Sequence, residues 1–121
     1  MIIVNYDLKD FCMQGSPTFL AHHASMVLPV SIRKVAKKAM LFLLENQIIG
    51  SKVLPGQCWK VVQGSGMGLK MSSNIADLAF MHSTEMCGIG ILSARCRSLH
   101  NVLFCRRFRD NLMFFCKPVF P

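Results

Sequence analysis

A glycine-rich turn between a short strand and a helix is the feature that most restricts how this chain can fold. The largely apolar segment 58–62 leads into the sequence GSGMG at residues 64–68, and Ser72 or Ser73 then offers an N-cap for a helix. Glycine tolerates positive φ and lets the backbone approach a partner closely. The segment therefore predicts a strand-to-helix connection that is suited to contact with a ligand.

Other segments alternate between strand and helix patterns. The N-terminal MIIVNYD predicts a buried strand that ends at Asp7, and residues 31–47 predict a helix capped by Ser31, after a turn at residues 15–17. The apolar runs 102–105 and 112–115 predict a β-hairpin with an Asp-Asn turn. We expect an α+β fold, in which a small antiparallel sheet carries two main helices packed on one face.

Composition narrows the class of protein. A length of 121 residues allows one domain, and a hydrophobic content of 52% excludes a disordered chain. Fourteen Lys and Arg against six Asp and Glu give a net charge of +8, which favours phosphate-bearing partners. No apolar run has the length of a membrane span and no signal peptide is recognisable. We therefore expect an intracellular protein that does not enter a membrane, in the nucleus or the cytoplasm.

Cysteine and histidine offer little for a metal site. The six cysteines form no C-x-x-C pair, which indicates reduced thiols in an intracellular protein. His22 and His23 are adjacent, so both cannot easily face one tetrahedral centre without further ligands.

The six acidic residues are more informative, because two of them lie where predicted strands end. Asp7 closes the first strand and Asp110 lies at the hairpin tip. Carboxylates that meet at strand ends repel each other unless an Arg or a hard divalent cation such as Mg²⁺ lies between them. Spacing alone also allows a purely structural interpretation, in which each carboxylate pairs with a surface Lys or Arg.

Three motifs follow one another in a characteristic order. They are VNYDLKDF at residues 4–11, QGSGMGLKMSS at residues 63–73 and RRFRDN at residues 106–111. In this order they resemble the palm subdomain of reverse transcriptases, especially those of retroelements without long terminal repeats or of Penelope-like elements. The resemblance covers roughly residues 1–116. It implies that residues 1–121 are one partial palm domain of an RNA-directed DNA polymerase, without fingers and thumb.

The resemblance also implies a set of site residues. Asp7 and Asp110 would be catalytic and, with Asn111, would hold Mg²⁺ or Mn²⁺ for nucleotidyl transfer. The partners would be an RNA template, a DNA primer and deoxynucleoside triphosphates. The residues expected along the templating base and the incoming nucleotide are Leu8, whose carbonyl would also face the metal, Phe11, Cys12, Gln63, Gly64, Gly66 and Gly68.

Two positions depart from the family pattern. Reverse transcriptases usually carry two aspartates at the hairpin tip, whereas Asn111 follows Asp110 here. The amide oxygen of Asn can still bind a cation, but the lost charge predicts weaker binding. Cys12 stands where the family places an aromatic side chain that excludes the ribose 2′-hydroxyl, so discrimination against ribonucleotides is not implied. We expect the isolated chain to be inactive.

Two other interpretations remain open. The segment VVQGSGMGL is similar to the start of a dinucleotide-binding unit, but Leu69 replaces the last glycine, and Glu85 does not end a strand. A noncatalytic basic module that binds nucleic acid or another partner requires only the net charge and the apolar surface. A divalent metal site at Asp7 and Asp110 would distinguish the polymerase from this module.

Overall fold

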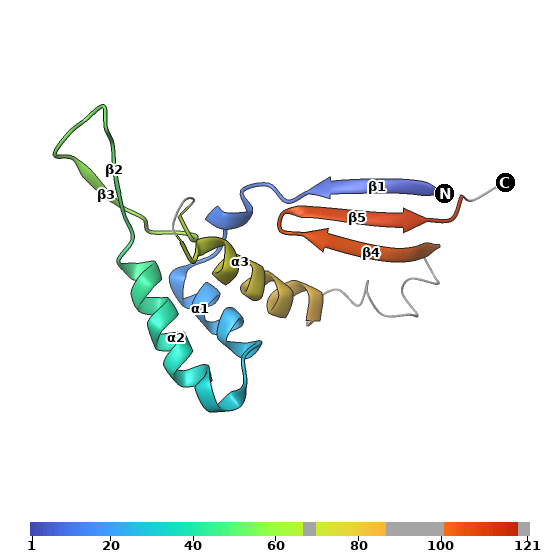
Figure 1. Cartoon of the computed structure of the whole chain (residues 1–121), viewed down its shortest axis with the longest axis horizontal. Helices are drawn as coiled ribbons and strands as arrows, with labels where there is room; N and C mark the ends of the chain where they lie inside the picture. Colours follow the sequence, from blue (N-terminus) through green and yellow to red (C-terminus); the bar gives the residue numbers. More distant parts are fainter. Residues whose placement is uncertain (67–69, 87–100, 119–121) are drawn as a thin grey trace. The chain divides into compact units, whose positions relative to one another are not determined.

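The computed structural model describes residues 1–66, 70–86 and 101–118 (Figure 1). The described residues form helices together with two antiparallel sheets, so the predicted α+β class is confirmed. The residues cluster into two compact units, one formed by residues 1–11 and 83–121 and the other by residues 12–82. The expectation that helices pack on one face of the three-stranded sheet stays a prediction. The expectation that the chain is a single palm domain also stays a prediction.

The first unit contains an antiparallel sheet of β1 (Ile2–Asp7), β4 (Val102–Phe108) and β5 (Asn111–Cys116). Figure 1 shows β5 between β1 and β4, which is the strand order β1-β5-β4. The pairing of β1 with β5 runs from Ile2 opposite Cys116 to Asp7 opposite Asn111. The N-terminal strand and the hairpin predicted from the apolar runs are therefore both present, and the hairpin strands are longer than predicted. The predicted burial of the N-terminal strand is wrong, because all residues of β1 except Val4 are exposed.

The second unit contains α1 (Pro17–Met26), α2 (Val30–Glu45), α3 (Ser72–Phe80) and a hairpin of β2 (Ile48–Gly50) with β3 (Cys58–Lys60). Helix α1 packs against both α2 and α3 (Figure 1). Its buried face is formed mainly by small side chains, which let the helices approach closely. The core residues of the three helices are Leu20, Ala21, Ala24, Leu44, Ile75 and Ala79.

Helix starts differ from the sequence prediction in three places. Residues 15–17, predicted as a turn, lead into α1, which begins at Pro17. The Ser16 hydroxyl caps this helix by accepting a hydrogen bond from the Phe19 N–H at 3.1 Å. Helix α2 begins one residue before Ser31, after Pro29, and has no side-chain cap. The predicted caps Ser31, Ser72 and Ser73 are wrong, because α2 and α3 already include these serines.

Two short helical segments complete the described part of the chain. They are the 3₁₀ helix η1 (Phe11–Met13) and the π-helical segment η2 (Met81–Met86). Many large apolar side chains remain exposed, including Val35 at 71% and Phe42 at 66% on α2. Within residues 1–66, 70–86 and 101–118, no helix combines the length and the apolar character needed to cross a membrane.

Candidate active site

Strand pairing brings the two predicted carboxylates to the same end of the three-stranded sheet. Asp7 is the last residue of β1 and lies opposite Asn111, the first residue of β5. The backbone N–H of Leu8 donates a hydrogen bond to the carbonyl oxygen of Asp110, with 2.7 Å between the two atoms. Three predicted metal-binding residues, Asp7, Asp110 and Asn111, therefore share one corner of this unit.

The hairpin turn fixes the orientation of Asp110 and Asn111. The Asn111 side-chain amide donates a hydrogen bond from Nδ2 to Asp110 Oδ1, at 3.2 Å. Because Nδ2 points to the carboxylate, the amide oxygen of Asn111 is left as an acceptor. Asp110 and Asn111 are half-buried and Asp7 is exposed, so solvent and ions can reach the corner.

Arginines lie on β4 and in its turn, in the same unit as these carboxylates. The guanidinium of Arg107 forms an ion pair with Glu85 and donates a hydrogen bond from Nη1 to the Arg109 carbonyl at 2.8 Å. Its Cζ lies 5.8 Å from the centre of the Phe11 ring, within the range of a cation–π contact. Phe11 and the hairpin are thus connected inside the first unit.

Glu85 has a second effect, on a thiol. Desolvation and, to a smaller extent, the charge of Glu85 raise the pKa of Cys105 on β4. This cysteine is therefore held in its neutral form.

The donors at this corner suit a hard cation. They comprise two carboxylates, an amide oxygen and the nearby backbone of Leu8, and oxygen ligands of this kind are preferred by Mg²⁺ and Mn²⁺. No group of three or more His, Cys, Asp or Glu side chains gathers at one point among the described residues. A cation here would consequently depend on two carboxylates, with Asn111 in place of a third.

The second unit positions the predicted nucleotide-contact loop. Gly64 has a φ of +76°, which a residue with a Cβ adopts only with strain. Its N–H donates to the Gly15 carbonyl at 2.8 Å, and the Ser65 N–H donates to the Cys12 carbonyl at 2.6 Å. Two predicted contact residues that are distant in the sequence, Cys12 and Gly64, therefore belong to one backbone network.

A side chain that the sequence analysis missed holds this loop. Gln47 is 5% exposed, and its Nε2 donates to the carbonyls of Leu44, at 2.9 Å, and Gly64, at 3.4 Å. Its Oε1 accepts a hydrogen bond from the Gly66 N–H at 2.6 Å. A glutamine just after a helix carries no sequence signal for such a role, because its partners lie 17 and 19 residues away.

The remaining predicted residues lie apart from these clusters or outside the described part. Gln63 is exposed, next to Gly64. Gly68 lies outside the described residues. Asp7, Leu8, Phe11, Asp110 and Asn111 belong to the first unit. Cys12, Gln63, Gly64 and Gly66 belong to the second.

A histidine pair also forms in the second unit. His23 on α1 and His82 at the start of η2 have their Nδ1 atoms 2.8 Å apart, so one ring donates a hydrogen bond to the other. Desolvation, followed by the neighbouring His22 and His82, lowers the pKa of His23. The partner of His23 is thus His82, a residue far along the chain. The adjacency of His22 and His23 in the sequence did not indicate this contact.

Comparison of the chain with protein-family models, with curated proteins and with solved structures finds no match.

Proposed function

We propose that this chain is the palm part of an RNA-directed DNA polymerase, with Asp7 and Asp110 as the residues that bind the catalytic divalent cation. The observation that carries the proposal is the corner at which β1 meets the β4–β5 hairpin. Asp7 and Asp110 come from motifs near opposite ends of the chain, yet Asp7 pairs with the neighbour of Asp110. The resemblance to reverse transcriptases requires this pairing, whereas a chance occurrence of the motifs would not.

The chemistry of the corner supports the same function. When bound, Mg²⁺ or Mn²⁺ acidifies a primer 3′-hydroxyl and stabilises the leaving pyrophosphate. The exposed Asp7 and the half-buried Asp110 provide negative charge for such a cation, and Asn111 provides an amide oxygen. Arg107 is already paired with Glu85, so its charge is partly neutralised.

The glycine loop would serve the nucleic acid. Gly64 and Gly66 carry no side chain, and Gln47 and the Gly15 carbonyl hold their backbone. Both glycines are buried, so a template base or a nucleotide would meet this loop at the exposed Gln63 beside them, without a loss of loop entropy on binding. Cys12, which is smaller than the aromatic residue of the family, would leave room for a ribose 2′-hydroxyl.

Titration with Mn²⁺ tests the proposal. We expect the chain to bind Mn²⁺ and to lose about tenfold in affinity with either Asp7→Asn or Asp110→Asn, measured by isothermal calorimetry. Glu45→Gln removes the same charge from α2 in the other unit and should leave binding unchanged. Equal affinities in all four proteins would contradict the assignment of the metal site.

The partners and the activity need a second assay. A primed RNA template should bind the chain more tightly in Mn²⁺, and the Asp7→Asn variant should lose this gain. The 121-residue chain alone should extend no primer, since fingers and thumb supply much of the positioning on which phosphoryl transfer depends. RNA binding that is indifferent to metal and to Asp7 would instead favour a noncatalytic basic module.

A further inference from the structure

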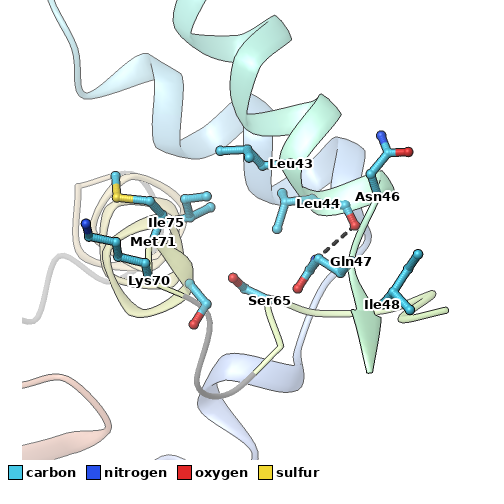
Figure 2. A pocket seen from close by; sticks show the side chains of 10 residues that line it. Leu43, Leu44, Asn46, Gln47, Ile48, Ser65, Lys70, Met71 and Ile75 are labelled. Carbon is cyan, nitrogen blue, oxygen red and sulfur yellow. Dashed lines mark hydrogen bonds between the residues drawn. The ribbon is translucent and has the colours of Figure 1, made fainter. Parts of the chain in front are cut away.

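The second unit contains a cavity of about 370 Å³ between the end of α2 and the start of α3. Figure 2 shows Leu43 and Leu44 on the α2 side, Ile75 and Met71 on the α3 side, and Ser65 on a third side. Most of the wall is apolar, because aliphatic and thioether side chains form it. Its size lies at the lower end of the range for small-molecule sites.

One polar group in this wall has no partner. The Ser65 side chain is 1% exposed, and its hydroxyl is the single buried side-chain polar atom without a hydrogen bond among the described residues. The backbone of Ser65 is satisfied, since its N–H donates to Cys12. Buried hydroxyls normally have a partner, so an orphaned one that lines a cavity indicates a position for a ligand atom.

Neighbouring protein groups already make other hydrogen bonds. Both polar atoms of the Gln47 amide, which also lines the cavity, bind backbone groups of Leu44, Gly64 and Gly66. The hydroxyl of Ser65 can both donate and accept, so it can bind an alcohol, an amide or a carboxylate oxygen.

Of an alcohol, an amide and a carboxylate, the electrostatics of the cavity favour the carboxylate, which is an anion. Met71 and Ser72 line it at the start of α3, and no side chain caps the N-cap position of this helix. The first N–H groups of a helix carry partial positive charge. Lys70 adds a cation at the rim: its ammonium points away from Ser65 in Figure 2, and its long stem can turn toward a bound anion. No Asp or Glu is among the described residues of the wall.

We propose that this cavity binds a small amphipathic carboxylate, with its head at the Ser65 hydroxyl and the α3 N-terminus and its apolar body between Leu43 and Ile75. The volume equals that of roughly a dozen water molecules at about 30 Å³ each, which leaves room for a short fatty acid. A phosphate fits less well, because most of the wall is apolar and would desolvate the phosphate oxygens that Ser65, the α3 N-terminus and Lys70 do not reach. This site does not depend on Asp7 or Asp110, so it stands or falls apart from the polymerase proposal.

The test is a titration with octanoate, and octanol and inorganic phosphate serve as comparisons. Binding is measured from the NMR shifts of the backbone amides. Octanoate should bind with a Kd of roughly 0.1–1 mM, as expected for a ligand of this size. It should shift the amides of Ser65 and Ser72. Octanol, which keeps the tail without the charge, should bind several-fold more weakly, and phosphate should not saturate in this range.

Variants identify the contacts. Ser65→Ala should weaken the affinity for octanoate about three- to tenfold. It should also raise the melting temperature of the free protein, because it removes an unsatisfied buried hydroxyl. Lys70→Gln, at an exposed position, should weaken binding about two- to threefold. Lys60→Gln makes the same charge change on β3, outside this cavity, and should have no effect. The proposal is overturned if octanoate leaves Ser65 and Ser72 unshifted, if octanol binds equally well, if phosphate competes equally, or if Ser65→Ala and Lys70→Gln bind like wild type.

Discussion

Asn111→Asp is the most informative change at the β1–hairpin corner. It places a second carboxylate beside Asp110, where Nδ2 of Asn111 now donates to Oδ1 at 3.2 Å. Two unit charges at that separation repel by about 1 kcal/mol in bulk water and by about 5 kcal/mol at an effective dielectric constant of 20. Because the carboxylates can rotate apart and are half-exposed, we expect the free energy of unfolding to fall by about 1–2 kcal/mol without metal.

Metal should reverse this loss. A cation between the two carboxylates removes the repulsion and gains a charged ligand, so we expect Mn²⁺ affinity to tighten at least tenfold, which is about 1.4 kcal/mol. By linkage, stability gained from metal grows with the ratio of free metal to Kd. The variant should therefore melt below wild type in chelator and recover most or all of the difference in saturating Mn²⁺.

Thermal melts of both proteins, in chelator and in a Mn²⁺ series, measure these effects. A loss of 1 kcal/mol corresponds to roughly 4 °C in a chain of this size. Asp10→Asn is a useful comparison, since it changes charge in the same unit at a residue whose φ of +53° suits Asn. Equal Mn²⁺-induced shifts in wild type and Asn111→Asp would refute the reasoning and leave the hairpin tip an ordinary turn.

Three further predictions follow from other parts of the structure. The pKa of His23 is lowered from its usual value of 6.5 in the folded chain, so the unfolded chain binds more protons than the folded chain does below about that pH. The free energy of unfolding should therefore fall from pH 7 to pH 5. Chemical melts should show a smaller fall for His23→Gln than for His22→Gln. Gly64→Ala, at a φ of +76°, should cost about 1–2 kcal/mol in urea melts, whereas Gly50→Ala, which has room for a Cβ, should change little. Iodoacetamide at pH 8 should modify the exposed Cys58 well before Cys105, whose pKa is raised, as peptide mass spectrometry would show.

Local sequence patterns predicted the strands better than the helices. The apolar residues of β1, β4 and β5 and the Asp-Asn turn contain enough short-range information to indicate strands and a hairpin. Helix α1 was missed because Ser16-Pro17 is equally typical of a turn and of a helix start. What decides in favour of a helix is the burial of Leu20 and Ala24 against α2 and α3, which no local window contains.

In the candidate site, too, contacts between residues that are distant in the sequence could not be predicted from local patterns. The pairing of Asp7 with Asn111 joins residues from opposite ends of the chain, and spacing alone cannot predict such a pairing. Only the proximity of Asp7 to Asp110 and Asn111 was expected, because the order of the motifs resembles a known palm. The partners of Gln47 and of His23 had no counterpart in any motif, since both are set by how the helices of the second unit pack.

The hydrogen bonds of Gln47 have a consequence for local unfolding. One side chain binds the last turn of α2 and two glycines of the loop, so release of its amide breaks hydrogen bonds at both places. The helix end and the loop should then open as one cooperative unit. In hydrogen exchange, the Gly66 amide would be protected as long as the end of α2 is, although it lies in a loop. A fluctuation of the helix would thus reach the glycine loop through a single side-chain amide.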